Sequence, residues 1–325
     1  MPASNVQSAL ALIAPDMQAM DRVIHARLNT GVPLVSQVSQ YIIGAGGKRL
    51  RPALLLMMAK ALGYQGEQHY LLAAVVEFIH TATLLHDDVV DESTLRRGRP
   101  TANVSFGNPA SVLVGDFLYS RSFQMMVEVQ NMRVMEILAG ATNTISEGEV
   151  LQLMNMHDAS LTTEDYLHVI RSKTAKLFEA CTRIAAVLQG CSAEREECCA
   201  TYGQALGTAF QIIDDVLDYE GQAEEMGKNL GDDLREGKTT LPLIIAMQKA
   251  TAEQAAVIRH AIEHGSVEAL DEVVAIVRST GSLADARVVA AAEADRAIAA
   301  IADLSDNAHA QALRALALGL QERRS

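Results

Sequence analysis

The sequence predicts an all-α protein, and three observations support that prediction. None of the seven prolines falls between Ala110 and Leu241, so helices are permitted throughout that interval. Alanine, leucine, methionine and glutamate are plentiful whereas aromatic residues make up 4% of the chain, and this composition favours helix over strand. Apolar residues also recur at helical spacing between the breaks. We therefore expect roughly a dozen helices.

Glycine and proline residues mark the expected helix boundaries. Breaks are predicted at positions 46–47, 63, 107–109, 190, 221–237, 265 and 281. Two stretches, TTED at 162–165 and TAEQ at 251–254, place an acid or amide three residues after a threonine, a pattern typical of helix starts. The alanine-rich, amphipathic segment 284–320 indicates peripheral packing helices.

The chain shows no sign of a boundary between domains. No linker rich in proline, glycine or serine and no repeat of fixed period interrupts it. Its 325 residues, 49% of them hydrophobic, can fill one substantial core. We therefore expect a single domain over residues 1–325.

The net charge and the apolar pattern limit the possible functions. Lys and Arg number 27 and Asp and Glu 40, so the net charge of −13 argues against nucleic acid as a partner. No basic residue precedes Arg22, and no uncharged apolar run reaches the roughly 18 residues of a membrane span, so we expect a cytoplasmic protein. The cysteines form no CxxC pair, which favours reduced thiols at Cys181, Cys191, Cys198 and Cys199.

The segment HDDVVDE at 86–92 places acids at the end of an apolar helix. Residues 71–85 are apolar nearly all round, so we expect other helices to surround this one. At 100° per residue, four polar positions fall within about 80° of one another: His80, Thr83, Asp87 and Asp91. Clustered carboxylates suit Mg²⁺, which completes its shell with water and phosphate oxygens. Alone the motif is weak, because a charged helix end is usually a solvated surface.

A second copy of the same spacing strengthens the first. Asp214, Asp215 and Asp218 end another long helix, after the apolar turns of ALGTAFQII. Gly207 and Gln211 lie on the acidic face of this helix, and the glycine permits close approach by a neighbour. The two helices could face each other across a cleft and hold several magnesium ions between their carboxylates.

Three basic segments could bind the phosphate that completes such a metal site. They are GGKRLRP at 46–52, LRRGRP at 95–100 and SKTAK at 172–176. Glycines let the backbone approach an anion, while lysine and arginine supply donors. The GK pairs at 227–228 and 237–238 are weaker signals of the same kind. For each segment alone, solvated surface charge is an equal alternative.

In this order the motifs resemble those of trans-prenyl diphosphate synthases. GGKRLRP, HDDVVDESTLRRGRP, KTA, FQIIDDVLD and GKNLGDD together span at least residues 46–242. The resemblance implies an all-helical bundle around a deep central cavity, with the two aspartate motifs facing each other. It also implies a homodimer, isopentenyl diphosphate and an allylic diphosphate as substrates, and Mg²⁺ as cofactor, with about three ions per active site.

The resemblance assigns a metal and catalytic role to the aspartates. Asp87 and Asp91 match magnesium ligands of the first motif, and Asp214 matches a ligand of the second. Asp88 would support the first group, while Asp215 and Asp218 would complete the second. The implied catalytic set adds two residues of the KTA segment, Lys173 and Thr174.

The basic segments divide between two diphosphates. The resemblance implies that the pocket for isopentenyl diphosphate consists of Lys48, Arg51, His80 and Arg97. It further implies that the allylic diphosphate contacts Arg96, Lys173, Thr174, Gln211 and Lys228, with Lys238 as an addition.

The length of the product depends on what lies beside the first acidic helix. A growing chain would pass Val76 and Ile79 and then Ala82 and Thr83, which are small. Residues 71–87 span about 24 Å as a helix, enough for several isoprene units. The floor of this pocket is expected on the next helix, among Phe123, Met125, Met126 and Val127, although core packing is the simpler explanation of each methionine.

The small residues and the uninterrupted first motif resemble those of medium- and long-chain enzymes. The wider similarity, including GEVLQLMN at 148–155, resembles octaprenyl diphosphate synthases of ubiquinone side-chain synthesis. We expect a farnesyl primer, an octaprenyl product and transient membrane contact when that product leaves. Alternatives are other product lengths from geranylgeranyl to decaprenyl, a non-catalytic subunit of a heteromeric synthase, or a structural scaffold. A terpene cyclase fits worse, because the chain repeats DDxxD and has no tryptophan.

Overall fold

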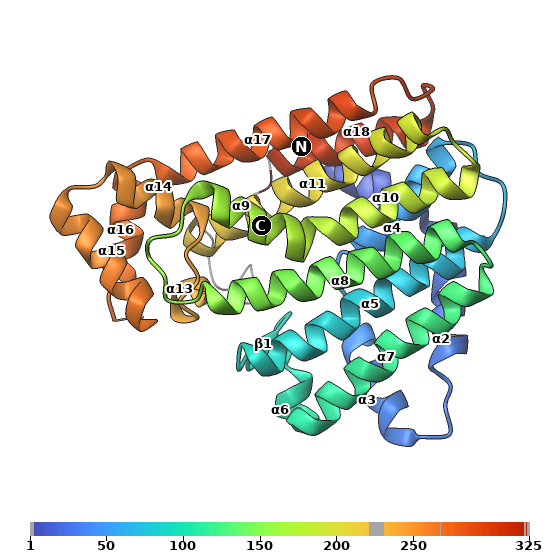
Figure 1. Ribbon diagram of the computed structural model, residues 1–325, viewed down its shortest axis with the longest axis horizontal. Helices are drawn as coiled ribbons and strands as arrows, with labels where there is room; N and C mark the ends of the chain where they lie inside the picture. Colours follow the sequence, from blue (N-terminus) through green and yellow to red (C-terminus); the bar gives the residue numbers. More distant parts are fainter. Residues whose placement is uncertain (1–2, 221–230, 267, 322, 324–325) are drawn as a thin grey trace.

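The computed structural model describes residues 3–220, 231–266, 268–321 and 323, which are helical almost throughout (Figure 1). This confirms the predicted all-α class. The elements are α1 (Ala3–Leu12), α2 (Ala14–Leu28), α3 (Pro33–Gly44), α4 (Leu50–Ala61), α5 (Gln68–Val90), β1 (Leu95–Arg96), β2 (Arg99–Pro100), α6 (Ala102–Phe106), α7 (Asn108–Glu128), α8 (Met132–Met154), α9 (Thr163–Ile170), η1 (Arg171–Ala175), α10 (Lys176–Gln189), α11 (Ala193–Glu220), α13 (Asp232–Arg235), α14 (Leu241–Lys249), α15 (Ala252–His264), α16 (Leu270–Ser279), α17 (Ser282–Ala300) and α18 (Ala308–Gln321). Short helices such as α13, which lies within a predicted break, bring the described helices above the roughly dozen expected.

Several helix boundaries fall where the sequence predicts them. Gly190 adopts a left-handed conformation with φ of 71° and ends α10, a backbone region that favours glycine. Both predicted helix starts are confirmed as reciprocal capping boxes, Thr162 with Asp165 at α9 and Thr251 with Gln254 at α15. Each box satisfies backbone donors that the first helical turn leaves free.

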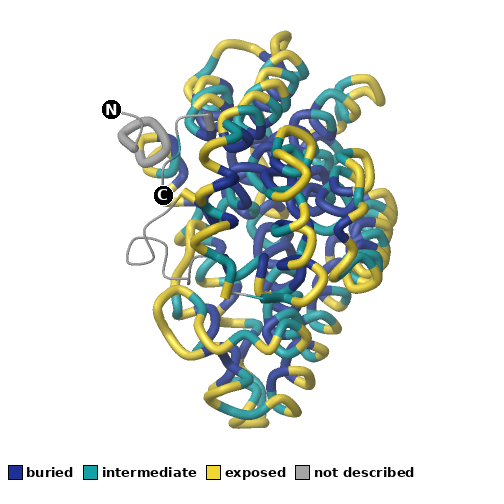
Figure 2. Tube along the Cα trace, turned by 90° about the vertical axis from the view of Figure 1, so that its left-hand side faces the viewer, coloured by how far each residue is buried: buried dark blue, intermediate teal, exposed yellow. Residues whose placement is uncertain are grey.

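α5 lies at the centre of the bundle. It packs against α2, α4, α7 and α10, and every side chain from 72 to 79 is buried. Figure 2 shows the buried segments gathered in the interior and the exposed ones at the outer turns. The expectation that other helices surround this helix is therefore confirmed. Each large apolar side chain buried here contributes about 1.5–3 kcal/mol.

Two clusters of buried side chains form the core, and α11 and α17 contribute to both. Tyr202 of α11 and Ala294 of α17 belong to the larger cluster around α4 and α5. Ile212 of α11 and Ala286 of α17 belong to the smaller one, which α14, α15 and α16 complete. α17 and α18 lie along one long edge of the molecule (Figure 1), as expected for packing helices.

A β-hairpin follows α5 and turns the chain back toward it. Leu95 pairs with Pro100 and Arg96 with Arg99 in antiparallel register. The two turn residues, Arg97 and Gly98, have φ values of 54° and 72°. Positive φ at both central positions is typical of the tight turns that join twisted strands. The hairpin places Arg96 beside Asp88 near the end of α5.

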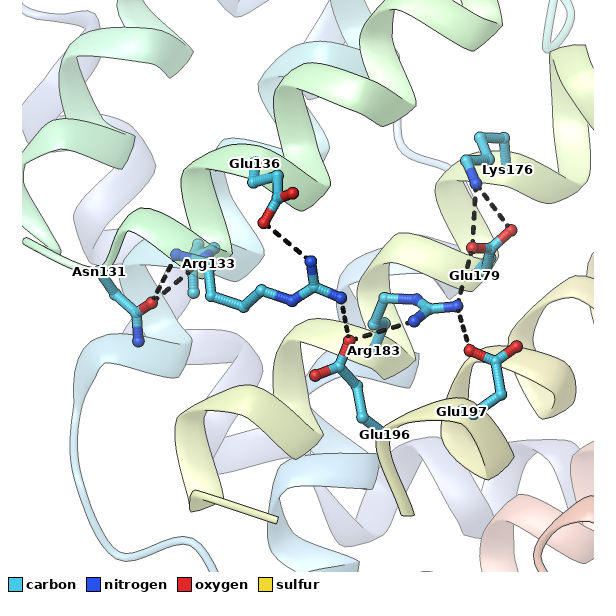
Figure 3. A network of polar contacts seen from close by, with 9 residues as sticks. Asn131, Arg133, Glu136, Lys176, Glu179, Arg183, Glu196 and Glu197 are labelled. Carbon is cyan, nitrogen blue, oxygen red and sulfur yellow. Dashed lines mark hydrogen bonds and ion pairs between the residues drawn. The ribbon is translucent and has the colours of Figure 1, made fainter. Parts of the chain in front are cut away.

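A network of charged side chains joins α8, α10 and α11 (Figure 3). Glu196 of α11 accepts hydrogen bonds from Arg133 of α8 at 2.6 Å and from Arg183 of α10 at 3.1 Å. Arg183 also lies 3.4 Å from Glu179, which accepts from Lys176 at 2.9 Å. Four of them, Arg133, Lys176, Glu179 and Arg183, border a cavity of about 250 Å³ between α8 and α10. Because α10 begins at Lys176, the network fixes the helix that directly follows η1.

The cysteines carry free thiols. Burial raises the pKa of Cys181 and of Cys199, the latter to about 12, so both thiols stay protonated at neutral pH. Among the described helices, none combines the length and the apolar character that crossing a bilayer requires.

Candidate active site

The first acidic motif ends α5 and is only partly open to solvent. The side chains of Asp87 and Asp91 are 20% and 13% exposed. Burial raises the pKa of Asp87 against the opposing effect of Lys173, and Asp91 raises it further. Asp88 is fully buried; its Oδ1 accepts from Nε of Arg96 at 2.8 Å and forms an ion pair with Nη2 at 2.7 Å. Asp88 therefore anchors the β-hairpin to α5 through its ion pair with Arg96.

Lys173 and Thr174 lie on η1, a π-helical turn between α9 and α10. Such wide turns are rare and frequently mark functional sites. The ammonium group of Lys173 lies 3.9 Å from Oδ2 of Asp87 and 2.6 Å from Oε2 of Glu149 on α8. The π turn therefore brings a lysine to the first acidic motif.

Two glycines allow the neighbouring helices to approach η1 closely. A Cβ atom on Gly148 of α8 would lie 2.8 Å from the backbone nitrogen of Lys173. One on Gly207 of α11 would lie 2.7 Å from Cα of Ala175. Both distances are far below van der Waals contact, and the atoms met belong to the backbone. The π turn is thus packed between two helices at positions where only glycine fits.

Thr174 links this turn to the second acidic motif on α11. Its hydroxyl donates a hydrogen bond to Oε1 of Gln211 at 2.9 Å, and Nε2 of Gln211 donates to Oδ1 of Asp215 at 2.7 Å. Tyr166 of α9 donates to the other carboxyl oxygen of Asp215 at 2.6 Å. Burial raises the pKa of Asp215 to about 8, with the carboxylate of Asp233 adding to the effect. Asp215 is therefore held inside the protein by its neighbours.

Lys238 makes a second connection between the motifs. Its Nζ lies 3.4 Å from Oδ2 of Asp91 and also pairs with Glu236. The same segment returns to α11, because the backbone nitrogen of Asp233 donates to Oδ2 of Asp218 at 3.2 Å. The segment after residue 230 thus contacts both acidic motifs.

A contact from the end of α8 holds that segment in place. The backbone nitrogen of His157 donates to the carbonyl oxygen of Gly237 at 2.8 Å, and the hydroxyl of Thr239 donates to that of Asp158, also at 2.8 Å. Gly237 has φ of 73°, and a Cβ atom there would lie 2.3 Å from Nδ1 of His157. These contacts fix the backbone on either side of Lys238.

Asp214 faces the end of the chain and a basic loop. Nη1 of Arg323 lies 2.6 Å from its Oδ1, and the guanidinium group lies 5.0 Å from the ring centre of Phe210. Burial and the charge of Arg323 lower the pKa of Lys48, whereas Asp214 raises it. Lys48 therefore shares this corner of the site. Arg323 belongs to no motif, and nothing in the sequence singles it out.

A separate basic group lies beside α5. Nη1 of Arg51 lies 3.1 Å from Nε2 of His80, and its guanidinium group lies 4.8 Å from the ring centre of Phe178. Burial, with Arg51 and Arg97 nearby, lowers the pKa of His80 well below its usual value, so the neutral ring accepts from Arg51. The guanidinium group of Arg97 packs directly against Gly47. A Cβ atom added to this glycine would lie 2.5 Å from the guanidinium carbon. The segments GGKRLRP and LRRGRP therefore meet.

The residues considered for product length take different positions. Four pack toward the core: Ala82, Phe123, Met125 and Met126. Thr83 is partly buried and donates its hydroxyl to the carbonyl oxygen of His80 at 2.8 Å. Val127 is 62% exposed, so it faces away from the interior, and the expectation that it could close the pocket is wrong.

The donor set fits Mg²⁺ by its chemistry. Within the described part of the chain, no three His, Cys, Asp or Glu side chains form a metal-binding cluster. Three carboxylates instead have a cation beside them: Asp87 with Lys173, Asp91 with Lys238, and Asp214 with Arg323. These carboxylate oxygens already accommodate a positive charge. They therefore suit Mg²⁺, which binds through one or two protein carboxylates and completes its shell with phosphate oxygens and water. Lys228 lies outside the described residues.

Several side chains of this site are absent from the predicted set, namely Tyr166, Glu149, Arg323 and Glu236. Glu149 lies within the quoted GEVLQLMN stretch, but a glutamate on an amphipathic helix is indistinguishable there from a solvated one. Glu236 stands two residues before Lys238, and that closeness is the only signal that could have indicated it.

Comparison with known proteins agrees with this geometry. Residues 32–278 match the Polyprenyl synthetase family. The octaprenyl diphosphate synthase of Escherichia coli (strain K12) is 51% identical over 314 residues, 96% of this chain and 97% of that protein. The all-trans-nonaprenyl-diphosphate synthase (geranyl-diphosphate specific) of Rhodobacter capsulatus is 46% identical over 308 residues, 94% of each chain. A crystal structure of polyprenyl synthase from Caulobacter crescentus CB15, complexed with calcium and isoprenyl diphosphate, has a TM-score of 0.95 at 43% identity and covers 98% of both chains. The chain therefore belongs to the polyprenyl synthetase family of prenyltransferases.

Proposed function

We propose that this prenyltransferase adds isopentenyl diphosphate units head to tail onto farnesyl diphosphate and makes octaprenyl diphosphate in the cytoplasm. The observation that carries the proposal is the double connection between the aspartate motifs, through Lys173 with Thr174 and through Lys238. The 51% identity to an octaprenyl diphosphate synthase supports the product. We also propose a single domain over residues 1–325, which the shared contribution of α11 and α17 to both core clusters supports.

The aspartates are proposed to hold Mg²⁺, about three ions per active site. Asp87 and Asp91 would serve from the first motif, and Asp214 with Asp218 from the second. When bound, Mg²⁺ neutralises a diphosphate and makes it a better leaving group. The Caulobacter crescentus relative, complexed with calcium and isoprenyl diphosphate, supports the binding of both a divalent cation and a diphosphate.

The allylic diphosphate is assigned to the space between the motifs. Lys173 and Lys238 supply ammonium groups that can donate to its oxygens. As the carbon–oxygen bond breaks, the oxygen atoms of Thr174 and Gln211 would stabilise the positive charge on the allylic carbon. Two further contacts are proposed for this diphosphate, Arg96 and Lys228.

Isopentenyl diphosphate is assigned to the basic group beside α5. Lys48, Arg51 and Arg97 would hold its diphosphate, and the neutral ring of His80 orients Arg51 by accepting its hydrogen bond. The double bond then attacks the allylic carbon, and loss of one proton to the departing diphosphate gives the new trans double bond. Holding both reactants in line converts a bimolecular step into an effectively unimolecular one.

The growing chain is proposed to run along α5, away from the aspartates. Small residues near the start of this path, Ala82 and Thr83, leave room for several isoprene units. Phe123 and Met126 on α7 are proposed as the floor, which their packing toward the core supports.

We also propose a homodimer. Large apolar side chains lie exposed on α7 and α8, namely Val112, Leu113, Val127, Met132, Val150, Leu153 and Met154. Large apolar side chains exposed together on neighbouring helices are typical of interaction sites. Light scattering should give about twice the chain mass of 34.9 kDa, and Leu113→Asp combined with Val127→Asp should lower it to one chain. A single-chain mass for the unaltered protein across a hundredfold range of concentration would contradict the dimer.

One incubation tests the activity and the product together. The pure protein is mixed with Mg²⁺, farnesyl diphosphate and isopentenyl diphosphate, and the products are separated by chromatography. We expect linear prenyl diphosphates with eight units as the main species. Cyclic hydrocarbons would indicate a cyclase, and a lack of any longer product would favour the non-catalytic subunit or the scaffold. A different main length would overturn the octaprenyl product only.

A further inference from the structure

Each active-site lysine is shared between an aspartate of the first motif and a glutamate outside both motifs. Lys173 lies between Asp87 and Glu149, and Lys238 lies between Asp91 and Glu236. We infer that Glu149 and Glu236 are positioning residues. They hold Lys173 and Lys238 in the site when a divalent cation replaces these lysines beside Asp87 and Asp91. The inference rests on the proposed function, because it deepens the account of the same site.

The distances favour the glutamates in both pairs. Nζ of Lys173 lies 2.6 Å from Glu149 and 3.9 Å from Asp87. Nζ of Lys238 lies closer to Glu236 than to Asp91, from which it is 3.4 Å away. Each ammonium group therefore has its main partner in the glutamate and a looser one in the aspartate. The looser contact is the one that a metal ion can replace.

These lysines and glutamates are largely buried, so an unpaired charge among them would be costly. The two lysines are 19% and 18% exposed, and the two glutamates 28% and 13%. An ammonium group that loses its partners in such surroundings is left as an uncompensated charge, which destabilises a protein. With the glutamate in place, a metal ion can take the aspartate without leaving the lysine alone. The freed donors then lie beside the metal, where diphosphate oxygens bind.

The chain is built to keep each glutamate beside its lysine. Glu149 follows Gly148, the residue whose lack of a side chain lets α8 contact the backbone of Lys173. Glu236 and Lys238 flank Gly237, whose φ of 73° forms a tight turn between them. The two pairs arise from unrelated local structures, yet they give the same arrangement at successive turns of α5.

Metal binding to the substrate-free, full-length protein tests the inference by calorimetry with Mg²⁺ alone. In Glu149→Gln, Lys173 has only Asp87 as a partner and competes with the metal, so Mg²⁺ should bind about fivefold more weakly. Lys173→Met removes the competitor, and Glu149→Gln added to it should change the affinity by less than about twofold. Glu236→Gln with Lys238→Met forms the parallel series.

The matched control is Glu147→Gln, which removes the same charge from the same helix. Glu147 is exposed, and its carboxylate accepts from Asn143 at 3.0 Å. This variant should bind Mg²⁺ within about twofold of the unaltered protein. Circular dichroism confirms that each variant is folded before it is titrated.

Two results would overturn the inference. One is an unchanged Mg²⁺ affinity in Glu149→Gln, and the other is an equal loss with Lys173 present or replaced, because a glutamate that binds the metal directly needs no lysine. Chain elongation is assayed on the same preparations. Unaltered protein that makes no product would contradict the proposed function alone, whereas an active enzyme without coupling between Glu149 and Lys173 would contradict the positioning role alone.

Discussion

The hydroxyl of Thr174 lies 2.9 Å from Oε1 of Gln211, and this hydrogen bond joins the π turn η1 to the helix that carries the second aspartate motif. The neighbouring residue on the turn, Lys173, faces the first motif at Asp87. Two adjacent residues thus connect acidic groups that are separated by more than a hundred positions in the chain. The position of the π turn therefore determines whether both motifs serve one site.

Because Gly148 packs against the π turn η1, a single added methyl group at this position should strongly reduce activity. Gly148→Ala would push a Cβ atom against the backbone of Lys173, so the turn must move. We expect turnover to fall at least about tenfold and KM for the allylic substrate to rise, because reacting groups tolerate little misplacement. Gly140→Ala on the same helix is the control, since a Cβ atom there meets nothing within 4 Å. Equal kinetics in the two variants would refute this role of Gly148.

Gly237 should be needed for the second connection. Gly237→Ala combines a left-handed backbone with a Cβ atom 2.3 Å from His157, so Lys238 should move away from Asp91. Gly190→Ala is the matched control, because Gly190 has φ of 71° and free space around its Cβ position. Both variants should lose about 1 kcal/mol of stability through the backbone. KM for the allylic diphosphate should rise only in Gly237→Ala, and a similar rise in both would exclude a specific role.

The sequence predicts the fold class, both capping boxes and the breaks at glycines because each depends on a few neighbouring residues. The partners of the charged side chains were not predictable in this way. Lys173 meets Glu149 through the packing of α8 on η1, and Arg323 reaches Asp214 only because the last helices fold back along α11. The π turn was also unpredictable, since its residues, RSKTA, have ordinary helix propensities.

Acid should weaken the fold through a buried histidine far from the active site. Burial lowers the pKa of His69 to about 4, with Lys60 adding to the effect and Asp16 opposing it. In the unfolded chain this pKa is about 6.5, so between these values the unfolded state binds more protons than the folded one. The contribution of neutral His69 to the free energy of unfolding is therefore fully present above pH 6.5 and is lost as the pH falls toward 4. The unfolding temperature of His69→Leu should therefore decrease less between pH 7 and pH 5 than that of the unaltered protein, and parallel curves would contradict this origin.

Product length should respond to one buried residue on α5. Ala82 is 1% exposed and precedes Asp87 on α5, along the proposed path of the growing chain. Ala82→Phe should fill the path and shift the main product to fewer isoprene units. Ala73→Phe, at another fully buried alanine of the same helix, controls for the strain of about 1–3 kcal/mol that overpacking causes. If folded Ala82→Phe makes products of unchanged length, the growing prenyl chain does not pass Ala82 and the proposed path is wrong.

The central claim is that both aspartate motifs serve one metal and diphosphate site. The most direct measurement is the rate of chain elongation, with Mg²⁺ and both substrates at saturation, in Asp87→Asn, Asp214→Asn and the exposed control Asp303→Asn. We predict a loss of at least about a hundredfold in each motif variant, the size of effect expected when a group that stabilises developing charge is removed. The control should keep its full rate and all three should keep their helical spectra. Undiminished elongation in folded Asp87→Asn or Asp214→Asn would contradict the account.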